Sequence, residues 1–83
     1  MGNVLARKGK LDAAINEYLE TLRISPNDKD AHFNLGSVLA GKGELDAAIN
    51  EFQEGLRINP NNSQAQSELS YCLAIKVRQD KRK

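Results

Sequence analysis

Large rings and sulfur are scarce in this chain. Its 83 residues include no Trp, two Tyr, two Phe and a single Cys. No disulfide can form within such a chain, and we expect large rings to contribute little to its packing. Ala, Leu and Ile must then supply the core, which favours helices over sheets. The scarcities therefore predict an all-α protein.

Long apolar runs and an excess of one charge are missing as well. No run of 18 apolar residues and no basic-then-apolar leader occurs, so we expect neither a membrane span nor a signal peptide. The compartment stays open, with the cytoplasm favoured. Twelve Lys and Arg nearly balance eleven Asp and Glu. Residues 76–83 nevertheless hold five Lys or Arg against one Asp, which makes a basic tail on a mildly acidic body.

The strongest signal is an internal repeat. When residues 2–28 are aligned on residues 36–62, 19 of the 27 pairs are identical. The shift from residue 2 to residue 36 defines the repeat period. A third copy begins at Ser63 and continues for half a period, with leucines at the matching places. A period of this length is typical of solenoids in which each repeat is a pair of helices.

Apolar residues recur at helical spacing twice within each period. Leu35 and Leu39 mark a first helix, and Ile49 and Phe52 mark a second. Between them lies the Gly-Lys-Gly segment 41–43, where a glycine can adopt the left-handed backbone that ends a helix. We predict helices at residues 1–8, 11–24, 28–41, 45–58 and 63–79.

Small residues occur inside these predicted helices. Gly36 and Gly55 lie where a glycine costs about 0.5–1 kcal/mol relative to alanine. Gly36 and Ala48 recur one period earlier as Gly2 and Ala14. We therefore expect these positions to let neighbouring helix backbones approach closely.

The repeat also matches a known pattern. Tetratricopeptide repeats follow W-x2-L-G-x2-Y…A-x3-F…P over about 34 residues. The chain resembles this family, and its HFNLG and LDAAINEF segments are similar to repeats of the kind found in the O-GlcNAc transferase arm. His32 and Leu39 stand in place of the Trp and the Tyr. The residues that match are Leu35, Gly36, Ala48, Phe52 and Pro60.

The resemblance implies a right-handed solenoid of about two and a half repeats. Residues 1–28 would be a truncated first repeat, 29–62 a complete repeat, 63–79 a capping helix and 80–83 a basic tail. The implied function is a non-catalytic protein-interaction module, the C-terminal part of a larger scaffold, that holds an extended peptide or a partner helix in a concave groove. By the resemblance, the groove is lined by Asn3, Arg7, Asp30, Phe33, Asn34, Ser37, Gln64, Ser67, Glu68 and Tyr71.

One binding mode of the family can be excluded from the sequence. The two-carboxylate clamp that holds chaperone tails needs basic residues at the places of Gln64 and Glu68. Asn3 and Asn34 match the two asparagines of the clamp. However, the carboxylate of Glu68 would repel the carboxylate that the clamp binds.

Residues suited to catalysis or metal binding are few. His32 and Cys72 are the sole residues of their types, and no nucleotide-binding or Ser-His-Asp pattern accompanies them. We expect His32 to fill a packing position and Cys72 to be a buried thiol. The sequence therefore predicts no enzyme, no metal and no cofactor.

Two alternative functions stay open. The basic tail, with Lys76 and Arg78, could neutralise phosphates, but Tyr71 alone offers a nearby stacking ring, which disfavours nucleic acid. Alternatively, the chain is a structural end-piece that associates with itself. An opening helix of about eight residues would be too short to be stable alone. Such a short opening helix would leave the apolar face of the next helix incompletely covered, at Leu11, Ile15, Leu19 and Leu22. We therefore expect a homo-oligomer, formed through the N-terminal hairpin or by exchange of helices across the 41–43 turn.

Overall fold

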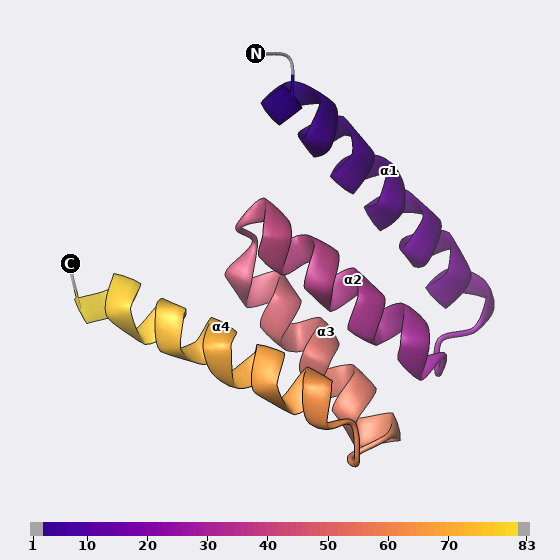
Figure 1. Cartoon of the computed structure of the whole chain (residues 1–83). Helices are drawn as coiled ribbons and strands as arrows, with labels where there is room; N and C mark the ends of the chain where they lie inside the picture. Colours follow the sequence, from indigo (N-terminus) through magenta and orange to yellow (C-terminus); the bar gives the residue numbers. More distant parts are fainter. Residues whose placement is uncertain (1–2, 82–83) are drawn as a thin grey trace.

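The computed structural model describes the backbone of residues 3–81 and the side chains of residues 9–79. This part of the chain forms four helices and no strand, which confirms the all-α prediction. Figure 1 shows α1 on one side, α2 and α3 side by side in the middle, and α4 on the other side. None of the described helices is long and apolar enough to cross a membrane. The helices are α1 (Asn3–Ile24), α2 (Lys29–Lys42), α3 (Leu45–Ile58) and α4 (Ser63–Lys81).

The prediction of two helices at 1–8 and 11–24 is wrong. Residues 3–24 form one continuous helix, and Gly9 does not adopt a positive φ. The first copy has one glycine fewer than the second at this place, because Arg7 stands where the second copy has Gly41. A single glycine inside a helix costs only about 1 kcal/mol, so the helix runs on. The predicted N-terminal hairpin therefore does not form, and self-association of the chain stays a prediction.

The hairpin of the second copy forms as predicted. Gly43 ends α2 with a φ of 91°, in the left-handed region. Its N–H donates to the carbonyl of Ala40 at 3.1 Å, and the N–H of Glu44 donates to the carbonyl of Leu39 at 2.9 Å. These two bonds satisfy carbonyls that the end of the helix would leave unpaired. The turn therefore closes α2 onto α3 within one chain.

Two phenylalanine rings lie at the centre of the core, contrary to the expectation that large rings would contribute little. Phe52 is completely buried and Phe33 is 8% exposed. A Cβ on Gly36 would lie 2.9 Å from the Phe52 ring, and a Cβ on Gly55 would lie 2.5 Å from the Phe33 ring. The small residues thus make room for aromatic side chains, whereas we had expected helix backbones to fill this space. Each ring of one helix fits against a glycine of the other.

The polar contacts at the two junctions between repeats are related by one repeat period. In each junction a side chain caps a helix, a second one bonds the carbonyl of a proline, and a lysine pairs with an aspartate of the preceding helix. The first junction has Asp28 to Ala31, His32 to Pro26 and Lys42 to Asp12. The second has Asn62 to Ala65, Gln66 to Pro60 and Lys76 to Asp46.

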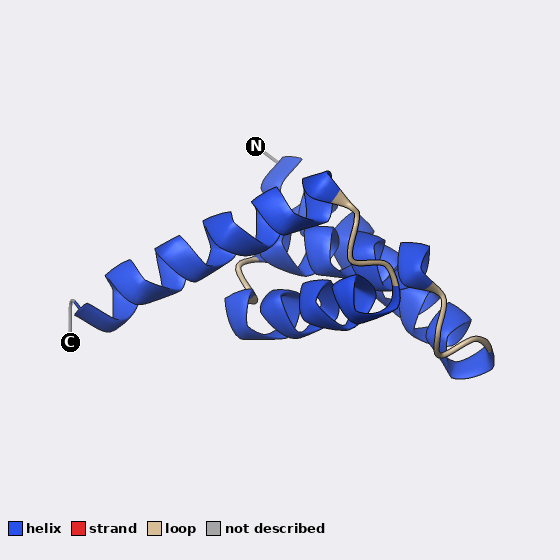
Figure 2. Cartoon of the chain, turned by 90° about the horizontal axis from the view of Figure 1, so that it is seen from below, coloured by secondary structure: helices blue, strands red, loops and turns tan. Residues whose placement is uncertain are grey.

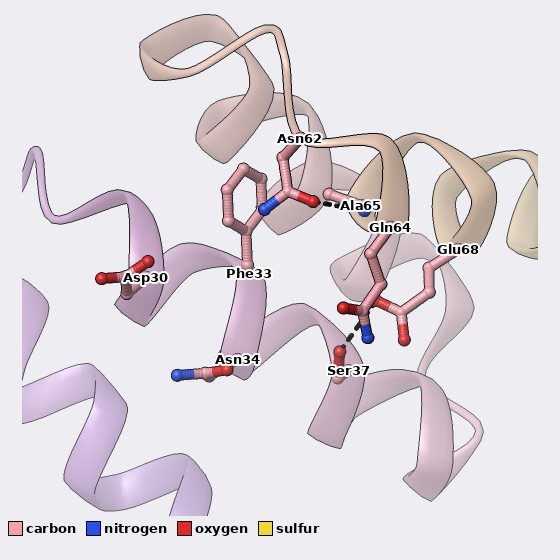
Figure 3. A pocket seen from close by; sticks show the side chains of 8 residues that line it. All are labelled: Asp30, Phe33, Asn34, Ser37, Asn62, Gln64, Ala65 and Glu68. Carbon is pink, nitrogen blue, oxygen red and sulfur yellow. Dashed lines mark hydrogen bonds between the residues drawn. The ribbon is translucent and has the colours of Figure 1, made fainter.

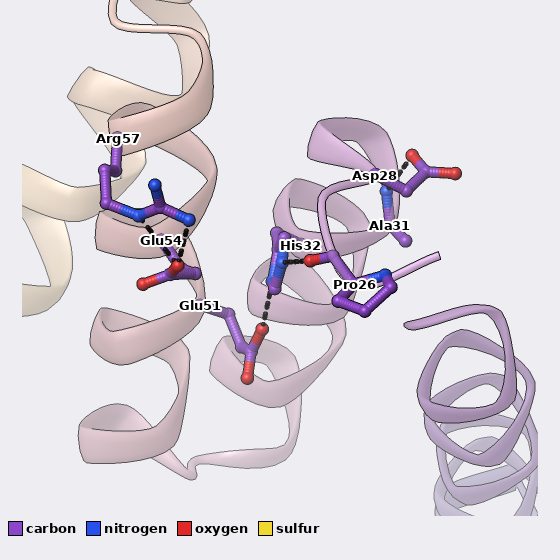
Figure 4. A network of polar contacts seen from close by, with 7 residues as sticks. All are labelled: Pro26, Asp28, Ala31, His32, Glu51, Glu54 and Arg57. Atoms are coloured by element: carbon purple, nitrogen blue, oxygen red, sulfur yellow. Dashed lines mark hydrogen bonds and ion pairs between the residues drawn. The ribbon is translucent and has the colours of Figure 1, made fainter. Parts of the chain in front are cut away.

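The histidine of the first junction is buried and carries two hydrogen bonds (Figure 4). Its Nδ1 lies 2.8 Å from Oε1 of Glu51, and its Nε2 lies 2.8 Å from the carbonyl oxygen of Pro26. Both partners are acceptors, so both ring nitrogens are assigned as donors, which requires the imidazolium form. His32 therefore fills a packing position, as predicted, and also ties the 25–28 loop to α3.

The pKa of His32 is raised above its ordinary value. Burial of the ring acts to lower it, but the hydrogen bonds to Glu51 and Pro26, with the charges of Glu51 and Glu54, act in the opposite direction and prevail. A raised pKa in the folded state means that the stabilisation is fully present below the unfolded pKa. It is lost as the pH rises through the folded pKa.

Substitution of Gly55 tests the fit between ring and glycine. We expect Gly55→Ala to lower the free energy of unfolding by about 1–3 kcal/mol, because the added methyl overlaps the Phe33 ring. Gly41→Ala is the matched control, since a Cβ there meets nothing within 4 Å. It should be neutral or stabilising by up to about 1 kcal/mol. Urea unfolding of both variants measures this, and equal effects would contradict the fit.

Substitution of Gly9 tests the continuity of α1. A Cβ at Gly9 meets nothing within 4 Å, and the residue is helical. Gly9→Ala should therefore stabilise the protein by about 0.5–1 kcal/mol. If residues 7–10 formed a turn like that at Gly43, with a left-handed glycine, the same substitution would be destabilising. Thermal unfolding of the two variants Gly9→Ala and Gly43→Ala decides between these, and a loss of stability in both would contradict a continuous α1.

The pH dependence of stability tests the His32 network. The free energy of unfolding should fall as the pH rises from 6 to 8, because the imidazolium loses its proton and one of its two bonds to acceptors. His32→Gln, which mimics Gln66 of the next junction, should flatten this dependence. A wild-type protein with constant stability over this range would show that the ring does not titrate there.

Candidate functional site

A hollow of about 120 Å³ lies between α2 and the start of α4 (Figure 3). The first two turns of α2 form one wall. The other wall is the 59–62 loop with the first turns of α4. The residues that line the hollow are Asp30, Phe33, Asn34, Ser37, Asn62, Gln64, Ala65 and Glu68.

The α2 wall is placed by helical spacing. Asp30, Asn34 and Ser37 follow one another at intervals of four and three residues, so they lie on one face. Asp30 and Asn34 are exposed and Ser37 is half-buried. Figure 3 shows the amide of Asn34 directed away from the helix, with no bond to the other residues drawn. This face presents acceptors and an amide to solvent.

Phe33 serves the core more than the hollow. It lines the hollow, yet its side chain is almost buried because the ring packs against Gly55 of α3. Stacking on a bound side chain would therefore use only a small part of the ring. Replacement of Phe33 would disturb the fold, which makes it unsuitable for testing a site.

A polar contact spans the hollow from α2 to α4. The hydroxyl of Ser37 donates to Oε2 of Glu68 at 3.0 Å (Figure 3). Both side chains are half-buried. The contact fixes the carboxylate of Glu68 in the hollow and leaves its other oxygen able to accept a further hydrogen bond.

The charge of the lining is negative. Asp30 and Glu68 are its two charged residues, and Lys and Arg are absent among the described lining residues. Amides of Asn34, Asn62 and Gln64 complete the polar surface, although the amide oxygen of Asn62 accepts the N–H of Ala65 at 2.9 Å. The arrangement is suited to a ligand that donates hydrogen bonds and carries positive charge.

Of the ten residues that the sequence suggested for a groove, the structure brings six together. Ser67 and Tyr71 lie on α4 outside the hollow, and Tyr71 is 68% exposed. The side chains of Asn3 and Arg7 lie outside the described residues. The six that line the hollow are Asp30, Phe33, Asn34, Ser37, Gln64 and Glu68.

Two lining residues, Asn62 and Ala65, were missed from the sequence. Asn62 is the helix cap of α4, and its carboxamide is turned toward the start of that helix. The repeat period pointed to it, because Asp28 caps α2 in the same way. Because α4 begins beside the face of α2, its cap residue Asn62 becomes part of the wall of the hollow.

Cys72 is a buried thiol, as predicted. It is 2% exposed, and burial, with the charge of Glu68, raises its pKa. Such a thiol holds its proton and is a poor nucleophile. No group of three or more His, Cys, Asp or Glu suited to a metal occurs among residues with described side chains.

Comparison with known protein families agrees with this geometry. A family model described as TPR repeat matches residues 2–43, just over half of the chain. A second, described as tetratricopeptide repeat, matches residues 29–62, which span the α2–α3 hairpin and the loop after it. A search of curated proteins found no match. The chain belongs to the tetratricopeptide repeat family, whose members generally mediate protein–protein interaction.

Proposed function

We propose that this chain is a non-catalytic interaction module that binds an extended peptide in the hollow between α2 and α4. The observation that carries the proposal is the row of Asp30, Asn34 and Ser37 on one face of α2, opposite Gln64 and Glu68 of α4. An amide offers both donors and an acceptor, so Asn34 and Gln64 can bond a peptide backbone without reading its sequence. A likeness to the O-GlcNAc transferase arm stays a prediction.

The charges of the hollow favour a basic peptide. Asp30 and Glu68 face a space whose lining has no positive side chain among the described residues. A Lys or Arg of the ligand would bring its charge between these carboxylates, and charge-assisted hydrogen bonds are about twice as strong as neutral ones. An acidic peptide would be repelled, in keeping with the exclusion of the two-carboxylate clamp.

An array of extended peptides tests this proposal. We expect peptides with a central Lys or Arg to bind, and the matched peptides with Glu to fail. Asn34→Ala together with Asp30→Asn should weaken binding at least tenfold, because the pair removes an amide and a charge. Asn50→Ala is the matched control, since Asn50 is exposed on α3 and does not line the hollow.

The helicity of all variants is measured alongside by circular dichroism. Asp30 and Asn34 are exposed, so their replacement should leave the fold intact. Equal affinity of the wild-type and the double variant would contradict the proposed site. Preference for the acidic peptides would contradict the charge argument alone.

The alternative of a polyanion-binding tail is less well supported. The ammonium group of Lys76 is paired with Asp46, so one of the five basic residues of the segment 76–83 already has an acidic partner. Tyr71 is exposed on α4 but lies five residues before Lys76. Binding of a polyanion that falls steeply with salt would favour this alternative.

A further inference from the structure

One face of α4 has no neighbouring helix in the described part of the chain, whereas the corresponding face of α2 packs against α3. The Lys76–Asp46 pair between α4 and α3 repeats the Lys42–Asp12 pair between α2 and α1, shifted by one repeat period. On a second face α2 also packs against α3, whereas no described helix covers that face of α4. Leu73 is 41% exposed and Val77 is 51% exposed. The open strip consists of Gln66, Ser70, Leu73 and Val77, all exposed and spaced by four, three and four residues.

The second half of α1, residues 11–24, has the complementary open face. It corresponds to α3, which uses one face for α4 and another for α2. The face of α3 that contacts α2 corresponds to a face of α1 that no described helix covers. Ile24 is 69% exposed whereas Ile58 is half-buried, and Tyr18 is half-buried whereas Phe52 is completely buried.

We propose that α4 of one copy binds residues 11–24 of a second copy, in the arrangement of α2 and α3. The binding partner is thus a second copy of the same chain. Figure 1 shows α1 and α4 on opposite sides of the molecule, so both faces can be used at once. The first support is the correspondence by one repeat period, because the fold already contains this helix pair once.

Side chains at the proposed interface differ in size from those of the α2–α3 pair. In the α2–α3 pair the ring of Phe33 faces Gly55. At the proposed interface Ser67 takes the place of Phe33 and Thr21 takes the place of Gly55. Two small side chains therefore replace a large ring and a glycine. The pair Phe52 and Gly36 becomes Tyr18 and Ser70. Since Ser70 has a Cβ where Gly36 has none, these helices lie slightly farther apart than α2 and α3.

Polar groups match as well. In the α2–α3 pair His32 bonds Glu51. The corresponding residues are Gln66 of one copy and Glu17 of the other. The amide nitrogen of Gln66 donates one hydrogen to the Pro60 carbonyl at 2.6 Å. Its second hydrogen remains available to a carboxylate such as that of Glu17, which is exposed.

Both helices extend beyond the parts that correspond. Figure 2 shows the C-terminal end of α4 running out past the other helices. It continues for five residues after Lys76, the counterpart of the last residue of α2. In an antiparallel pair this end lies beside the residues that precede Leu11 in α1. Since Arg78 and Lys10 would approach there, added salt should strengthen the association.

The interface joins two different faces, so it does not close on itself in a dimer. Copies would add head to tail into a continuing solenoid or a ring. An interface between identical faces would instead stop at two copies. This difference decides the experiment.

Two single variants and their mixture test the proposal. Ser70→Arg blocks the α4 face, and Thr21→Arg blocks the α1 face; both residues are exposed, so the fold should tolerate the changes. Asn50→Arg on α3 is the matched control. The mass of each is measured by light scattering from micromolar to millimolar concentration, with circular dichroism to confirm helicity.

We expect the mass of the wild-type and of the control to rise past that of a dimer of the 9.2 kDa chain. Each blocked variant should stay monomeric. An equimolar mixture of the two should form dimers and nothing larger, because one open face of each kind remains. A monomeric wild-type, a mass that stops at the dimer, or a mixture that stays monomeric would each overturn the proposal.

Discussion

The packing of two phenylalanine rings against two glycines holds α2 and α3 together, and the other helices are placed by this pair. Phe52 lies against Gly36, and Phe33 lies against Gly55. In both directions a ring fills the space that a missing side chain leaves, so the helices approach closely while burying large apolar surfaces. α2 then offers one face to α1, and both helices offer faces to α4. The hollow between α2 and α4 depends on the same packing, because Phe33 belongs to the core and also lines the hollow.

The same set of polar contacts occurs at both junctions between repeats, so the helices at the two junctions are held in the same way. A helix cap, a bond to a proline carbonyl and a Lys–Asp pair recur after one repeat period, while their members change from Asp28 to Asn62 and from His32 to Gln66. The amide of Gln66 keeps the bond to the carbonyl and removes the charge. The first junction therefore contains the histidine with the raised pKa, and the second junction contributes Asn62 and Ala65 to the lining of the hollow.

Much of this fold follows from the sequence, and the exceptions have physical reasons. The period and the spacing of leucines predicted α3 at its observed limits and α2 within one residue. The same pattern failed at Gly9, since periodicity marks apolar faces but does not say whether one glycine ends a helix. The alignment placed Asp30, Asn34 and Ser37 on one face correctly. It missed Asn62, because its place in the wall depends on the path of the loop, and it overrated Phe33 as a surface residue, because only packing shows that the ring is buried.

Amide hydrogen exchange of the whole chain tests the central role of the α2–α3 pair most directly. If ring and glycine packing sustains the fold, the amides in the middle of α2 and α3 exchange only when the whole protein unfolds, and they are the slowest in the molecule. Amides of α4 exchange faster, and those around Gly9 in α1 exchange fastest among the helices. The slowest exchange in α1 or α4, or equal protection of all four helices, would contradict this account.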